Sequence, residues 1–206
     1  MGNDGKCYLE EEGPLPGSKN SSLYAKENEI EWLTLRSQNK GNIRIAQNEL
    51  EICASAVPLS MDMAIPAMVL TRQKDFDDKL WCKMHFDPIQ DGDLAGMVVY
   101  LSNQYYYRMG IKREKGLKYL VVEKVADDFY QVAYQKEITD TNITLGINAE
   151  KTNYHFLILQ NSVPREVCSA STRFLCCEFA GKCFTGTLWG CMQKVWRIVV
   201  LSQDLI

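Results

Sequence analysis

The sequence predicts an all-β protein, folded as two packed antiparallel sheets of the jelly-roll type. The first observation is the stretch Leu80–Arg113, which contains three strand-like runs at Leu80–Phe86, Ala95–Leu101 and Tyr105–Lys112, joined by polar connectors. The second is that about a dozen such runs follow one another at spacings of roughly 8–12 residues, as in a sandwich. The third is that no long segment shows helical periodicity.

The elements before and after this stretch define the domain boundaries. Residues 1–29 are polar and rich in Gly, Pro, Ser and Asn, so they are predicted to be an N-terminal arm or linker, and residues 30–206 form the sandwich domain. Residues 31–36 alternate between polar and apolar and predict the first strand. Further strands are predicted at Ile43–Ile45, Leu50–Ala54, Met68–Gln73, Gly116–Val125, Phe129–Ile138, Ile143–Asn148, Asn153–Leu159, Phe184–Met192 and Val195–Leu201.

The composition excludes several classes of protein. The chain has 206 residues, of which 46% are apolar, so it can form a sizeable core. The net charge is −3 and no basic block occurs, which argues against a nucleic-acid partner. No run of about 18 apolar residues predicts a membrane span. The N-terminus lacks the apolar segment of a secretory signal, and Lys6 breaks the myristoylation pattern, so a cytoplasmic location is expected.

The chain has eight cysteines, and in a reducing cytoplasm these are expected to be free thiols rather than disulfides. No C-x-x-C motif occurs, so neither a zinc knuckle nor a thioredoxin-type site is supported. Burial as small hydrophobic side chains accounts for the cysteines, and no cofactor is predicted.

The titratable residues do not compose a recognisable catalytic site. His85 and His155 lie within predicted strands, and the sequence shows no nucleophile oriented by either of them. The loop that contains Asp87, Asp91 and Asp93 offers hard oxygen ligands for calcium, but it lacks the EF-hand pattern. Acidic loop residues commonly hydrogen-bond their own backbone, so no metal site is predicted.

Aromatic residues suggest a surface for sugar. Tyr105 and Tyr107 share one face of their strand and Tyr106 takes the other, so one face could present phenol rings to a pyranose. Tyr106 and Trp81 are the candidate carbohydrate contacts. The alternative for the tyrosines is core packing with cross-strand pairing.

A series of short motifs follows in a fixed order along the chain. The motifs are Leu70–Gln73, Phe86–Pro88, Ala95–Tyr100, Asn103, Tyr105–Ile111 and Cys177–Thr187, with Trp32 and Leu35-Arg36 in the opening strand. In this order they resemble the C-terminal domain of β-xylosidases and α-L-arabinofuranosidases of glycoside hydrolase family forty-three. The resemblance covers about Glu31 to Gly190 and implies a concanavalin A-like β-sandwich.

The resemblance also implies where the chemistry lies. In that family the catalytic acid, base and positioning carboxylates lie in an N-terminal five-bladed propeller, which needs about 300 residues. At most thirty residues precede the sandwich in this sequence, so no catalytic residue is carried over. Phe184 matches an aromatic that can reach the rim of the active site, with packing between the sheets as the alternative. After Gly190 the sequence departs from the family pattern, although Cys191–Leu201 can still form a closing strand.

Three hypotheses follow from these features. The first is a non-catalytic accessory sandwich, inactive alone, that supports hemicellulose and xylan degradation by a family forty-three propeller. The second is a stand-alone carbohydrate-binding module for xylo- or arabino-oligosaccharides, with Tyr106 or Trp81 in contact with the sugar. The third is a structural or interaction domain without sugar affinity, for which an exposed apolar face predicts self-association.

Overall fold

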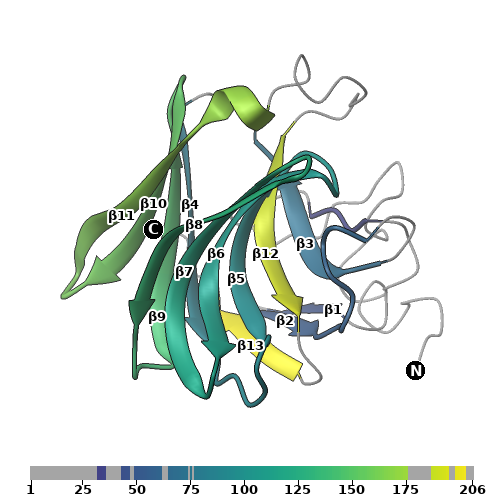
Figure 1. Ribbon diagram of the computed structural model, residues 1–206, viewed down its shortest axis with the longest axis vertical. Coiled ribbons are helices and arrows are strands. Elements are labelled where there is room, and N and C mark those ends of the chain that lie inside the picture. Colours follow the sequence, from purple (N-terminus) through teal and green to yellow (C-terminus); the bar gives the residue numbers. More distant parts are fainter. Residues whose placement is uncertain are drawn as a thin grey trace.

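The computed structural model describes residues 32–35, 43–46, 49–61, 65–73, 75, 77–175, 187–194 and 198–202. Within this part of the chain, thirteen strands form two antiparallel sheets, as the sequence predicted (Figure 1). A single 3₁₀ turn, η2 (Thr172–Leu175), is the only helical element described. No helix in the described ranges is long and apolar enough to cross a membrane.

The six-stranded sheet contains most of the stretch that first indicated the fold. Its order is β3 (Ala67–Arg72), β12 (Leu188–Lys194), β5 (Leu94–Tyr100), β6 (Tyr105–Glu114), β7 (Leu117–Ala126) and β8 (Phe129–Glu137). From β5 to β8 the strands follow one another as hairpins, so this half of the sheet is a meander. β12 inserts between β3 and β5 and joins a late segment of the chain to two earlier ones.

The seven-stranded sheet is assembled from more distant segments. Its order is β1 (Ile43–Ala46), β2 (Glu49–Cys53), β13 (Ile198–Ser202), β4 (Asp78–His85), β9 (Asn142–Ala149), β10 (Asn153–Gln160) and β11 (Val163–Ser171). β8 and β11 are the last strands of their sheets on the same side of the sandwich (Figure 1). Residues 138–141 cross from β8 of the first sheet to β9 of the second.

The main core lies between the two sheets. Alternation places Leu80, Cys82 and Met84 of β4 on the inner side of their sheet, while the side chains between them face outward. Tyr107 of β6 enters the same core from the other sheet. Its ring lies 6.4 Å from that of Tyr154 and 6.5 Å from that of Phe156, both in β10. Side chains at alternate positions of facing strands therefore fill the interior, as in other aligned sandwiches.

A second apolar cluster covers the outer face of the six-stranded sheet. Its members include Leu70, Leu94, Val98 and Tyr106, which alternate with the inward-facing residues of the same strands. Leu33, Leu35 and Leu59 come from segments outside the sheet and pack on this cluster. Leu33 also forms a bridge with Leu70, and each residue donates its backbone N–H to the carbonyl of the other, at 2.6 and 2.8 Å. This sheet is therefore apolar on both faces over part of its area.

Two differences from the sequence-based strands have clear causes. The expected first strand at 31–36 is described over 32–35 only, where it forms the isolated bridge at Leu33. β11 was not predicted, because Pro164, Arg165 and Glu166 interrupt the alternation that marks a half-buried strand. β11 is an edge strand, and the edge of a sheet tolerates both a proline and solvent-exposed charges.

Candidate functional site

The predicted carbohydrate contacts do not come together in one place. Phe184 lies outside the described residues. Trp81 is half-buried on the outer face of the seven-stranded sheet, paired with Gly146 of β9. A Cβ on that glycine would lie 2.6 Å from Cε3 of the indole, so the ring lies directly over the glycine backbone. The sugar contact at Trp81 stays a prediction.

Tyr106 belongs to the apolar cluster on the opposite layer and is only 4% exposed. Its ring is 6.3 Å from that of Tyr100, and the Arg108 guanidinium lies 5.8 Å above it. Burial raises the pKa of its phenol. The alternation correctly placed Tyr106 and Tyr107 on opposite faces, but chain segments cover both faces here. A sugar could stack on Tyr106 only after these segments moved, and this contact also stays a prediction.

The aspartates considered for calcium are engaged by protein groups. Asp93 is buried, and its Oδ2 accepts hydrogen bonds from the backbone N–H groups of Ile89 and Gln90. Asp91 Oδ1 accepts from the N–H of Gly116, and Asp87 forms an ion pair with Lys118 at 2.6 Å. In the described ranges no group of three or more His, Cys, Asp or Glu side chains could hold a metal ion. The loop acids thus stabilise turns and connect neighbouring loops.

The two histidines lie on the outer face of the seven-stranded sheet, as expected for strand histidines. His85 Nδ1 is 2.8 Å from Oδ1 of Asn142, its partner in the adjacent strand. His155 Nδ1 is 3.0 Å from Oε2 of Glu166. Each imidazole therefore has a cross-strand partner on the sheet surface.

A buried ionic cluster on the outer face of the six-stranded sheet was missed by the sequence reasoning. The side chain of Glu123 is 0% exposed, with Arg108 Nε 2.5 Å from its Oε2 and Lys112 Nζ 3.0 Å from its Oε1. The hydroxyl of Tyr130 donates a third hydrogen bond, at 2.7 Å. The sequence signal was Glu123 itself, since it shares one face of its strand with the apolar residues Val121 and Val125.

The charges around Glu123 determine its ionisation. Burial acts to raise the pKa of the carboxyl group, but Arg108, the Tyr130 hydroxyl and Lys112 together outweigh it. The pKa of Glu123 is therefore lowered and the group is a carboxylate. Burial and the hydrogen bond to Glu123 raise the pKa of Tyr130, so that the phenol stays a donor. Because its partners satisfy this carboxylate, the arrangement is that of a structural ion pair rather than a catalytic acid.

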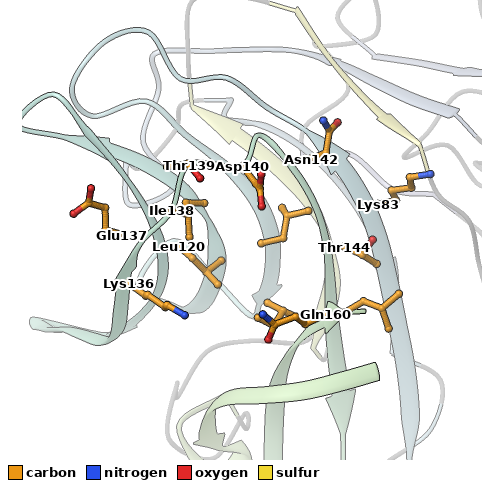
Figure 2. A pocket seen from close by; sticks show the side chains of 13 residues that line it. Lys83, Leu120, Lys136, Glu137, Ile138, Thr139, Asp140, Asn142, Thr144 and Gln160 are labelled. Atoms are coloured by element: carbon orange, nitrogen blue, oxygen red, sulfur yellow. The ribbon is translucent and has the colours of Figure 1, made fainter. Parts of the chain in front are cut away.

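A cleft of about 490 Å³ opens between the sheets where residues 138–141 pass from β8 to β9. Leu120, Ile143 and Ile158 provide an aliphatic floor, contributed by both sheets. Figure 2 shows Lys136 and Gln160 pointing toward one another, while Asp140 lies apart from them beside Thr139. No sequence motif marked this cleft, because its lining combines the segment between residues 136 and 144 with side chains of β4, β7 and β10, which are distant in the sequence.

Comparison with known proteins identifies the sandwich. The family model described as the beta-xylosidase C-terminal concanavalin A-like domain matches residues 24–193. The chain belongs to this family. The described residues of the match, together with β13 beyond it, form the two antiparallel sheets expected for a concanavalin A-like sandwich. The sandwich is therefore an accessory C-terminal domain of family forty-three glycosidases, whose catalytic domain is a separate module.

Individual relatives support this assignment. The non-reducing end α-L-arabinofuranosidase BoGH43B of Bacteroides ovatus is 29% identical over 126 residues, which are 61% of this chain and 24% of that protein. The structure of the Bacteroides ovatus xyloglucan-locus protein GH43B has a TM-score of 0.76 at 22% identity, covering 89% of this chain and 36% of that one. The xylan β-1,4-xylosidase of Bacillus halodurans gives 0.73 at 16% identity, with coverages of 83% and 35%.

The coverage places the similarity within one domain of these proteins. This chain spans between a quarter and about a third of the length of each relative named. The structural similarities, all below 25% identity, show the fold of this family member. Activities named for those relatives belong to those whole proteins.

Proposed function

We propose that this concanavalin A-like domain supports the hydrolysis of hemicellulose oligosaccharides by a family forty-three catalytic propeller and has no glycosidase activity of its own. The observation that carries the proposal is the family match over residues 24–193, which covers the described sandwich except for Lys194 and β13. The named relatives include an arabinofuranosidase and a xylan β-1,4-xylosidase, and these names suggest pentose-containing substrates.

The physical role in this proposal is that of a docked support. A catalytic domain that packs against a rigid sandwich gains buried surface, and anything that binds the folded form stabilises it by mass action. Extensive pairing within both sheets gives the sandwich the rigidity that this role needs. The propeller would be the partner, and xylo- or arabino-oligosaccharides would be the substrates of the pair.

The test measures activity of the chain with and without a propeller. The purified chain is assayed on aryl β-D-xyloside and aryl α-L-arabinofuranoside, alone and mixed with the separately produced propeller of a family member. We expect no turnover from the chain alone, and a higher activity and melting temperature of the propeller in the mixture. An unrelated β-sandwich of similar size is the control. Protein-dependent turnover by the chain alone, or no effect on the propeller at saturating concentrations, would contradict the proposal.

We also propose that the protein works in a reducing compartment, the cytoplasm. Cys53, Cys82, Cys168 and Cys191 are free thiols, which supports this location. Labelling of thiols in freshly lysed cells, with and without a reductant, tests it. Equal labelling in the two samples is expected, and a reductant-dependent increase would contradict it.

A further inference from the structure

The cleft between the sheets has the properties of a small-molecule site that the accessory role does not use. Its volume of about 490 Å³ lies within the range of about 300–1,000 Å³ that is common for ligand pockets. The cleft lies where the two layers separate, between the end of β8 and the start of β9. Most of its polar rim is exposed, so a ligand could enter from solvent without a movement of the backbone.

The floor provides a surface for packing. Leu120 is only 1% exposed, and Ile143 and Ile158 are partly buried beside it. These side chains come from β7, β9 and β10, so strands of both sheets hold the floor in place. A ligand that buries C–H groups against this floor removes apolar surface from water, which favours binding.

The rim provides hydrogen-bonding groups of opposite character. Lys136 offers an ammonium donor and Asp140 a carboxylate acceptor, and neither group makes a hydrogen bond or ion pair with another described residue. Gln160 uses its Oε1 to accept a hydrogen bond from Arg165 Nη1 at 3.0 Å, which leaves its amide N–H groups as donors. The rim therefore combines donors and an acceptor around one space without pairing them to each other.

The aliphatic floor and the mixed polar rim together restrict the kind of ligand that fits the cleft. The charged side chains that line the cleft are Lys83, Lys136, Glu137 and Asp140, two of each sign, so the rim favours neither an anion nor a cation. A sugar ring fits both parts, because its C–H groups pack on aliphatic side chains while each hydroxyl can donate to a carboxylate and accept from an ammonium or amide. We propose that the cleft binds a short neutral oligosaccharide, and that Asp140, Lys136 and Gln160 hold its hydroxyls.

The identity of the sugar as a pentose oligomer rests on the proposed function. None of the described residues that line the cleft is aromatic, so the affinity is expected to be weak, with a dissociation constant on the order of 1 mM. Weak binding suits a site that would retain oligosaccharide near a neighbouring catalytic domain without trapping it.

A titration by nuclear magnetic resonance tests the site on the intact chain. Xylotriose and arabinotriose are added to about 20 mM, and backbone amide shifts are followed. We expect saturable shifts that concentrate on residues 136–144 and 158–160. Shifts confined to the surroundings of Trp81 or Tyr130, or no saturable shift with either sugar, would overturn the proposal. Glutamine serves as a zwitterionic probe, and binding of glutamine without binding of sugar would also overturn it.

Substitutions of exposed rim residues identify the contacts. Asp140→Ala and Lys136→Ala are each expected to weaken sugar binding about tenfold, because each removes a charge-assisted hydrogen bond. Lys151→Ala is the matched control, since that lysine is exposed and does not line the cleft. Unchanged melting temperatures would verify that the variants fold, and unchanged affinity in both alanine variants would refute the assignment.

The test of sugar binding in the cleft can fail independently of the test of the proposed function. Loss of sugar binding in the Asp140→Ala variant should leave the support of a propeller unchanged, because the proposed support rests on docking of the two domains and not on sugar in the cleft. A chain that binds xylotriose but does not affect the propeller would retain the site and contradict only the supporting role.

Discussion

The thiols of Cys82 and Cys191 lie 3.6 Å apart at the centre of the sandwich, one contributed by each sheet. Both side chains are fully buried, and the two sulfurs share a hydrogen bond. That hydrogen bond, together with burial, raises the pKa of the Cys82 thiol well above its ordinary value. The contact is a packing contact between layers, in which both sulfurs behave as small hydrophobic groups.

This contact predicts a difference in thiol reactivity. The reactive species is the thiolate, which is disfavoured at Cys82 and inaccessible at both positions. We expect iodoacetamide to label Cys82 and Cys191 at least about 100-fold more slowly than the partly exposed Cys53, because labelling requires opening of the core. Peptide mass spectrometry after timed labelling measures the rates, and denaturant should abolish the difference. Comparable native rates at Cys53 and Cys82 would contradict the prediction.

The buried carboxylate of Glu123 predicts a large effect of a small substitution. Glu123→Gln removes the charge that compensates Arg108 and Lys112, and its amide N–H groups face either Arg108 or the pair of donors Lys112 and Tyr130. We expect the free energy of unfolding to fall by about 3 kcal/mol, measured by urea denaturation. Glu114→Gln is the control, because that carboxylate is 46% exposed and 3.7 Å from Lys112, and its loss should cost less than about 1 kcal/mol. Equal effects of the two substitutions would argue against the buried cluster.

The same carboxylate makes stability depend on pH. The pKa of Glu123 in the folded protein lies below the ordinary value of 4.5, so the unfolded chain binds this proton first as the pH falls. Its contribution to stability is therefore complete above pH 4.5 and is lost as the pH falls from there through the folded pKa. The difference in unfolding free energy between wild type and Glu123→Gln should be constant near neutral pH and should shrink under acid. If this difference in unfolding free energy grew below pH 4.5, the pKa of Glu123 would be raised by folding and not lowered, which would contradict the prediction.

The sequence predicted well which side chains of a strand share a face. It did not predict which distant segments of the chain cover that face. Alternation placed Tyr106 and Tyr107 on opposite faces, and the bounds of β6 and β9 were predicted to within one or two residues at each end. It could not show that Leu33 and Leu59 cover Tyr106, because those segments are more than forty residues away along the chain. The cleft at residues 136–144 was not predictable for the same reason, since its floor joins side chains from β7, β9 and β10.

Replacement of glycine by alanine is expected to destabilise the protein by different amounts at different strand positions. A Cβ on Gly110 would lie 2.1 Å from the carbonyl oxygen of Ala95, and the neighbouring glycine of β5, Gly96, is equally crowded by backbone. Backbone atoms of a central strand cannot move away cheaply, so Gly110→Ala should cost about 3 kcal/mol or more, or prevent folding. At Gly146 the obstacle is the ring of Trp81, which can rotate. Gly146→Ala should therefore cost only about 1–2 kcal/mol.

A double substitution tests the cause at Gly146. In a Trp81→Ala background the ring is absent, so the added cost of Gly146→Ala should largely disappear. The unfolding free energies of the four proteins in this cycle give the coupling. Equal costs of Gly146→Ala in the two backgrounds would show that backbone conformation, and not the indole, restricts this position.

The edge strand β8 predicts self-association through its apolar side chains. Phe129, Tyr130 and Val132 are 55%, 52% and 39% exposed, and β8 has no strand partner beyond β7 in the described part of the sheet. An exposed apolar edge is a template for pairing with another chain, so light scattering should give an average mass above the monomer mass of 23.5 kDa at high concentration. The variants Phe129→Lys and Val132→Lys should restore the monomer mass, because a charged edge resists pairing. Val163→Lys on β11, at a residue 58% exposed, is the matched control and should leave the association unchanged. A wild-type mass of 23.5 kDa at every concentration, or an equal effect of Val163→Lys, would show that β8 is not the contact.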